Sequence, residues 1–132
     1  MANYHCAART NYFRVKDEAA FRAWAVRRGV EIAESFAVHR GHFAVFATDG
    51  EAFPNYDSDR DEEVDFAAEL AGHLAPDSVA VVLEVGAEKL CYLVGMALAI
   101  NAHGQRVALD LADIYRLAEQ AFIQPAPTRA EY

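Results

Sequence analysis

The chain has 132 residues, of which 54% are hydrophobic, and it carries a formal net charge of −8 at pH 7. Its length fits one domain with its own core, and its hydrophobic content excludes a disordered protein. The sequence contains no run of 18 apolar residues, which excludes a membrane-spanning helix, and its acidic balance disfavours direct nucleic-acid binding.

The first part of the chain predicts a strand followed by a helix. Residues 4–16 are rich in aromatic and β-favouring side chains. Asp17 is a suitable N-cap for a helix that runs to about Arg28 and ends at Gly29. Three apolar residues recur at helical spacing and should face the core: Phe21, Trp24 and Ala25.

The middle of the chain predicts two strands, a loop and a second helix. The strands are expected at residues 30–38 and 42–48, and the loop at residues 51–60. Either Asp59 or Asp61 is placed to cap a helix that runs to about residue 73.

The last part predicts three strands, at residues 79–85, 90–101 and 106–109, and a helix capped by Asp110. We expect Gly86 to take a positive φ in a strand-to-strand turn, and Gly95 to mark a bulge or a close approach. The resulting order, β-α-β-β-α-β-β-β-α, predicts a single α+β domain over residues 1–124, with a tail over residues 125–132. Its sheet should be mainly antiparallel, with the helices packed on one face.

The net charge is concentrated in one segment. Residues 49–69 contain nine acids and one base, which sum to −8, so the rest of the chain is neutral. A localised acidic block steers basic partners and repels nucleic acid. The candidate partner-binding residues are its acids and two interleaved aromatics: Asp49, Glu51, Phe53, Tyr56, Asp57, Asp59, Asp61, Glu62, Glu63, Asp65 and Glu69.

Three interpretations of this block are open. Asp57, Asp59 and Asp61 have the spacing of a calcium loop, but its glycine and its final glutamate are replaced by Glu62 and Ala68. Acids at a helix N-terminus also complement the helix dipole without any partner. The third interpretation is a docking surface for a basic protein, which would give the exposed aromatics a role.

Other chemistry has weaker support in the sequence. His5 with Cys6, and His39 with His42, lack the paired spacing of a structural zinc site. Glu84 and Glu88 flank a predicted turn and leave acid–base catalysis open as an alternative. We therefore predict no catalytic residue, no metal and no cofactor.

Cysteine usage and the first residues bear on location. Cys6 and Cys91 lie far apart, and the first five residues lack the basic-then-apolar order of a secretory signal. We expect reduced, buried thiols and a cytoplasmic protein. Residues 1–40 are modestly basic, so their attraction to the acidic block allows a homodimer.

Three patches resemble a family of small uncharacterised bacterial proteins carried on phages, plasmids and conjugative elements. The patches are residues 9–17 (RTNYFRVKD), residues 86–95 (GAEKLCYLVG) and the terminal Glu131-Tyr132. The resemblance implies cargo of mobile elements, where small acidic proteins often disarm host defence. It implies no catalytic residue.

These observations predict a non-enzymatic inhibitor of the anti-CRISPR or anti-restriction type. Its acidic face would dock, as a DNA mimic does, on a basic nucleic-acid-binding protein of a host defence system. Two alternatives remain: a small metal-dependent or acid–base enzyme that uses Glu84, Glu88 and a histidine, and an accessory interaction module for conjugation.

Overall fold

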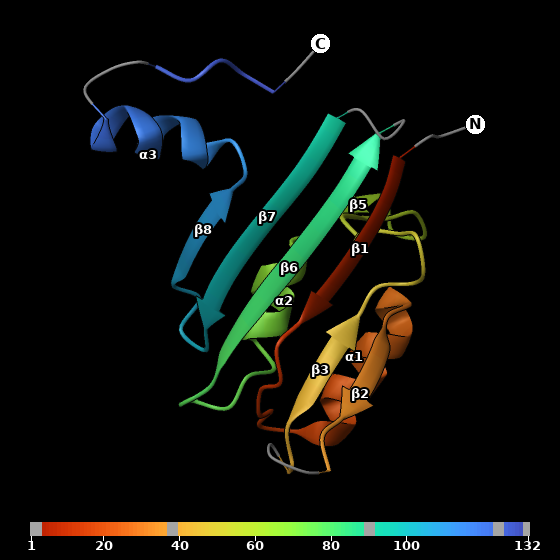
Figure 1. The fold of residues 1–132 in the computed structure, drawn as a ribbon. Coiled ribbons are helices and arrows are strands. Elements are labelled where there is room, and N and C mark those ends of the chain that lie inside the picture. Colours follow the sequence, from red (N-terminus) through yellow and green to blue (C-terminus); the bar gives the residue numbers. More distant parts are fainter. Residues whose placement is uncertain (1–3, 37–39, 89–91, 123–125, 131–132) are drawn as a thin grey trace.

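A six-stranded sheet forms the centre of the structure, a computed structural model that describes residues 4–36, 40–88, 92–122 and 126–130 (Figure 1). The strands pair antiparallel in the order β2-β3-β1-β6-β7-β8. They are β1 (Tyr4–Thr10), β2 (Glu31–Glu34), β3 (Phe43–Phe46), β6 (Val79–Glu88), β7 (Tyr92–Asn101) and β8 (Arg106–Asp110). A separate two-stranded hairpin pairs β4 (Tyr56–Asp57) with β5 (Glu62–Glu63).

Helices α1 (Glu18–Arg28) and α2 (Phe66–Ala71) lie behind the sheet in Figure 1, and α3 (Asp113–Ala121) follows β8. The predicted α+β class is therefore confirmed.

Helix α1 has the ends and the buried side that its sequence predicts. The Asp17 carboxylate accepts a hydrogen bond from the Ala20 N–H at 3.1 Å, and Gly29 takes a φ of 70° just after the last turn. A left-handed φ at this point costs glycine little. The three residues expected in the core are all buried: Phe21, Trp24 and Ala25.

The core lies between α1, α2 and the face of the sheet that they cover. Phe21 is fully buried, and its ring centroid lies 5.8 Å from those of both Phe13 and Phe43. Thr10 is the buried polar residue among the described residues. Its hydroxyl donates to the Asn11 carbonyl and accepts from the Val45 N–H, so its burial leaves no unpaired group.

Strand β1 ends at Thr10, so the prediction of a strand to residue 16 was wrong beyond that point. Asn11 explains the break, because its side-chain amide takes over the hydrogen bonds of the ladder. Its Oδ1 accepts from the Val81 N–H at 2.7 Å, and its Nδ2 donates to the Val79 carbonyl at 3.1 Å. The chain then turns across the end of the sheet toward α1.

The second helix begins later than predicted, at Phe66, and its N-cap is Asp65, whose carboxylate accepts from the Ala68 N–H at 3.1 Å. The prediction that Asp59 or Asp61 caps this helix was wrong, because both lie at the tip of the β4–β5 hairpin. Residues 59–63, which the sequence pattern favoured for the first helical turn, instead form the turn and the second strand of the hairpin.

The prediction of a turn around Gly86 was also wrong. Strand β6 runs on to Glu88, and Gly86 pairs with Cys6 on one side and Val94 on the other. Its φ is not positive. The close approach expected at Gly95 is confirmed, since a Cβ atom there would lie 2.8 Å from Leu111 Cγ.

Helix α3 does not pack on the sheet, contrary to the prediction that all helices cover one face. None of its residues is buried, and Figure 1 shows it beyond the end of β8. The residue directly before the helix is Ala112, which makes no side-chain cap bond. Asp110, the predicted cap, lies two residues earlier. Its carboxylate accepts a hydrogen bond from the Asp113 N–H at 3.1 Å, and the Asp113 carboxylate accepts one from the Asp110 N–H at 2.7 Å. Within the described residues no helix has the length and apolarity needed to cross a membrane.

We predict that Phe21→Ala lowers the free energy of unfolding by about 3–5 kcal/mol, because it removes a fully buried ring and leaves a cavity among aromatic neighbours. Val26→Ala is the matched control, since Val26 lies on the same helix and is 81% exposed; its effect should stay within about 0.5 kcal/mol. Urea unfolding followed by circular dichroism measures both. Equal effects would contradict this assignment of the core.

Candidate functional site: an acidic hairpin

The acidic block folds into the β4–β5 hairpin and the segments on either side of it. Tyr56 pairs with Glu63 and Asp57 with Glu62. The Asp57 side chain forms the turn, since its Oδ1 accepts from the N–H groups of Asp59 at 3.0 Å and Arg60 at 3.2 Å. Aspartate commonly nucleates a turn in this way. Asp61 takes a φ of 53°, a conformation that Asp and Asn tolerate better than most side chains.

Arg28 anchors the hairpin to α1 and α2. Its Nη1 lies 2.9 Å from Asp57 Oδ2, and its Nε and Nη2 each lie 2.8 Å from one oxygen of Glu69. The Trp24 indole N–H donates to the same Glu69 at 2.8 Å. The Arg28 and Asp57 side chains are only 12% and 14% exposed. The contact of Arg28 with both oxygens of Glu69 fixes the orientation of the two side chains in addition to pairing their charges.

The ion pairs shift the pKa values of both acids. Hydrogen bonding from Arg28 lowers the pKa of Glu69 and of Asp57 below their ordinary range, more than burial raises it. The same hydrogen bonds raise the pKa of Arg28. Asp57 and Glu69, predicted as partner-binding residues, therefore have internal partners in the fold. Both oxygens of Asp57, the first residue of the calcium-loop pattern, already have partners within the protein.

Asp65 also has internal partners. The backbone hydrogen bond from Ala68, and then Arg106 with its Nη2 at 3.2 Å from Asp65 Oδ2, lower the pKa of Asp65. Of the two aromatic candidates, Phe53 is half-buried and stacks on Phe66 with ring centroids 4.3 Å apart. Tyr56 is 49% exposed. Phe53 thus supports the loop from the core side, and Tyr56 is available at the surface.

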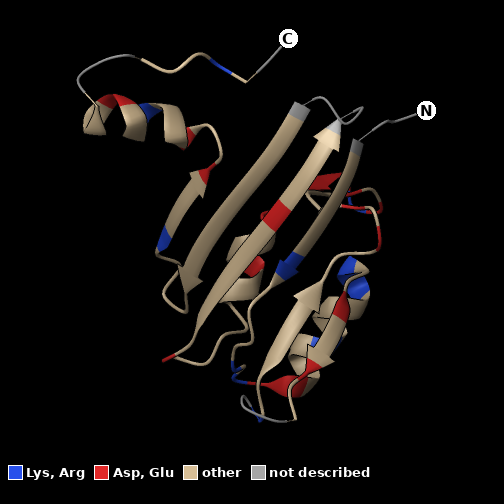
Figure 2. Ribbon diagram, viewed as in Figure 1, with Lys and Arg blue, Asp and Glu red and all other residues tan. Residues whose placement is uncertain are grey.

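The other six acids of the block are exposed, and in the described part of the chain their carboxylates have no hydrogen-bond or ion-pair partner: Asp49, Glu51, Asp59, Asp61, Glu62 and Glu63. We call these six the free acids. Figure 2 shows the acidic colour gathered along the hairpin and the segment that leads into it, beside β1. The free acids of the hairpin, Asp59 to Glu63, are held on one short element by the Arg28 anchor.

A groove of about 590 Å³ lies between the segment before the hairpin, the start of α2 and strands β6 and β7. Glu84, from the middle of β6, is half-buried and lines it together with Glu63 and the apolar Phe53 and Met96. No histidine among the described residues lines this groove. The side chain of Glu88, the second carboxylate of the enzyme hypothesis, lies outside the described ones.

The histidines and the cysteine considered as metal ligands in the sequence are not gathered into one cluster among the described residues. Those residues contain no cluster of three or more His, Cys, Asp or Glu side chains suited to a metal ion. His42 lies near the β2–β3 connection, whereas His5 lies on β1, and His39 falls outside the described residues. Cys6 is buried, and burial, then the charges of Glu84 and Glu51, raise the pKa of its thiol.

Arg28 belongs to this site although no pattern in the sequence predicted it there. The available signal was an arginine in the last turn of the helix, where a basic side chain is also expected at a plain surface position. Distinguishing the two requires the position of a hairpin that lies 29 residues later in the chain.

No protein-family model, curated protein or solved structure is detectably similar to this chain.

The contacts of Arg28 with Asp57 and Glu69, together called the Arg28 network, make the free energy of unfolding depend on pH. The pKa values of Asp57 and Glu69 lie below their ordinary 3.8 and 4.5 in the folded chain. The folded state therefore binds fewer protons than the unfolded state in acid. The stabilisation is complete above about pH 5 and is lost as the pH falls through the lowered pKa values. We predict that Arg28→Gln destabilises the protein at pH 7, and that its difference from wild type narrows as the pH falls toward 3.

Urea unfolding at pH 7, 5, 4 and 3 measures this difference. Arg60→Gln, at the hairpin tip, makes the same charge change without removing a side-chain contact of the network. It should leave the pH dependence of unfolding close to that of wild type. A constant gap between Arg28→Gln and wild type at all four pH values would contradict the assigned network.

Proposed function

We propose that this chain is a non-enzymatic protein-binding inhibitor, of the anti-CRISPR or anti-restriction type, that docks its acidic hairpin on a basic nucleic-acid-binding protein. The observation that carries the proposal is that the acids of the block fall into two groups, one paired within the protein and one exposed without a partner. Asp57, Asp65 and Glu69 are paired internally, and the six free acids face solvent.

The anchor is what suits the hairpin for binding. A flexible acidic loop would lose conformational freedom when a partner ordered it, which weakens association. Here Arg28 and the turn made by Asp57 hold the backbone before a partner arrives. Carboxylates held in this way can occupy positions on a basic surface that otherwise take phosphates, and their charge speeds encounter.

The exposed Tyr56 adds an apolar contact next to the charges. Tyrosine is enriched at protein interfaces, because its ring buries area while its hydroxyl keeps a polar partner. The resemblance of the three patches to proteins carried on mobile elements is the reason that we propose host defence proteins as the class of partner. The location we propose is the cytoplasm, where such proteins act.

We predict that expression of the chain raises phage plating efficiency on bacteria that restrict the phage by CRISPR or by a restriction enzyme. Asp59→Lys with Glu62→Lys should abolish the gain, because it reverses the charge of two free acids at the hairpin. Asp61 is left unchanged, because its positive φ would strain a lysine.

The matched control is Glu31→Lys with Glu119→Lys, which makes the same change of net charge at two exposed acids outside the hairpin. It should keep the gain in plating. Both variants are first checked for wild-type unfolding curves. A gain that survives the hairpin reversal, or its absence in every strain tested, would contradict the proposed function.

A further inference from the structure

The face of the sheet opposite α1 and α2 is apolar, and no helix among the described residues covers it, although Leu111 lies against Gly95 at one point. Side chains alternate along each strand, so the registered rows across β1, β6, β7 and β8 place every second residue on this open face. Six large apolar residues there are between 44% and 76% exposed: Val79, Leu83, Val85, Leu93, Val107 and Leu109. Arg9 is the only Lys, Arg, Asp or Glu that the described parts of these strands place on this face.

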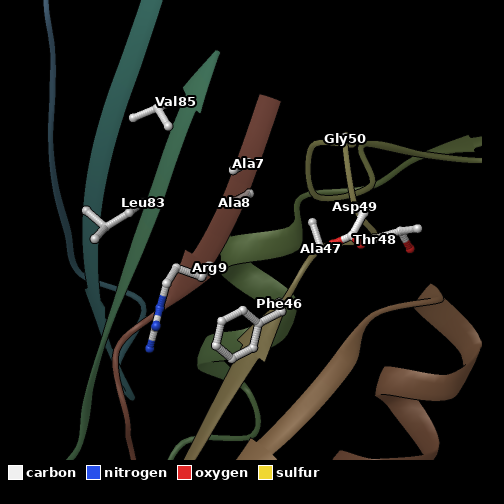
Figure 3. Close-up of a pocket in the computed structure, with 10 residues that line it drawn as sticks. All are labelled: Ala7, Ala8, Arg9, Phe46, Ala47, Thr48, Asp49, Gly50, Leu83 and Val85. Atoms are coloured by element: carbon white, nitrogen blue, oxygen red, sulfur yellow. The ribbon is translucent and has the colours of Figure 1, made fainter. Parts of the chain in front are cut away.

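On the open face, a row of small residues lies between rows of larger ones. Gly95, Ala97 and Ala99 follow one another along β7, and larger side chains stand beside them. Leu83 and Val85 come from β6, and Leu109 from β8. A hollow of about 450 Å³ lies at the margin of this face between β6, β1 and the end of β3. In Figure 3, Leu83 and Val85 lie on one side of it, and Phe46 and Asp49 on the other. The Arg9 guanidinium lies 4.5 Å from the Phe46 ring centroid, which brings its charge close against an apolar group.

Helix α3 and the residues beside it present a second apolar surface, which the described residues cover only in part. Leu111 lies against Gly95 of β7, and Tyr115 contacts Arg129 and Ala130 of the tail. Four large apolar residues on and beside it are between 48% and 62% exposed: Leu111, Ile114, Leu117 and Phe122. Its polar residues, Asp113, Arg116, Glu119 and Gln120, lie on the opposite side at helical spacing. A helix of nine residues is marginal in water unless its apolar side is packed.

We propose that two copies of this chain associate through these surfaces, with α3 of each copy lying on the open sheet face of the other. One chain supplies both an apolar platform and an amphipathic helix without a platform, so a two-fold arrangement satisfies both at once. The ten exposed residues and the alanines between them would bury on the order of 800 Å² per copy, the share of a standard-size interface. Exposed apolar patches larger than a few hundred Å² are uncommon on monomers.

This apolar dimer differs from the homodimer that the sequence allows, in which basic residues 1–40 of one copy attract the acidic block of the other. Attraction between the basic N-terminal part and the acidic block would weaken in salt, whereas apolar contacts persist. Asp49 lines the hollow at the margin of the open face, but the four free acids of the hairpin do not line it. The proposed docking of the hairpin therefore does not depend on this dimer.

Light scattering coupled to size exclusion, over a range of concentrations and at 0.1 and 1 M NaCl, tests the proposal. The chain mass is 14.6 kDa, and we expect twice that mass at both salt concentrations. Ile114→Glu should weaken the dimer by roughly 100-fold or more, because the interface would bury an unpaired charge. The variant should still fold, since Ile114 is 60% exposed in the single chain. Leu83→Glu, on the sheet, should act in the same way.

Gln120→Glu is the matched control, because it adds one negative charge on the polar side of the same helix. It should remain dimeric. A monomer at all concentrations, a dimer that dissociates at 1 M NaCl, or a dimer that both glutamate variants leave intact would overturn the proposal. Dissociation by Leu83→Glu alone would overturn the placement of α3. A monomer destabilised by Ile114→Glu would show that α3 packs on its own sheet.

Discussion

The contact of Arg28 with Glu69 and Asp57 determines how the acidic part of this molecule is arranged. It joins the last turn of α1 to α2 through Glu69, and to the β4–β5 hairpin through Asp57. The hairpin has only two residue pairs of its own, and such a short ribbon is not stable in isolation. Its position therefore depends on the arginine and on the stacking of Phe53 on Phe66 just before it. Arg28 engages Asp57 and Glu69, and Arg106 pairs with Asp65, so the six free acids are the ones left to face solvent.

The sheet separates two kinds of surface. Its helix-covered face contains the aromatic core, and its open face contains aliphatic side chains with little charge. The acidic hairpin lies at one side of the sheet, next to β1, whereas α3 leaves from the opposite edge strand, β8 (Figures 1 and 2). A partner held by the hairpin and a second copy held on the open face would occupy different regions. In the proposed assembly, two acidic hairpins would be presented by one dimer, which raises the effective concentration of the second once the first has bound.

The features that depend only on residues within one helix or strand could be predicted from the sequence. The cap at Asp17, the stop at Gly29 and the buried side of α1 depend on residues within one helix, so spacing alone identifies them. The strand order in the chain and the α+β class follow from alternating and continuous apolar runs in the same way. The errors lie where a distant segment competes for the same groups. Asn11 ends β1 because its amide bonds to β6, and the hairpin prevents Asp59 and Asp61 from starting α2.

By itself, the sequence determined the class of fold, the acidic segment and its charge, because composition and short-range periodicity carry these directly. The tertiary structure alone decided which acids are free. Pairing of Asp57 and Glu69 with Arg28 depends on side chains separated by 29 and 41 residues, and no local pattern records such a contact. It also decided that α3 stands clear of the sheet. Its apolar spacing predicts a packed helix, but whether the surface it packs on belongs to its own chain depends on the path of the backbone after β8, where Leu111 crosses onto Gly95.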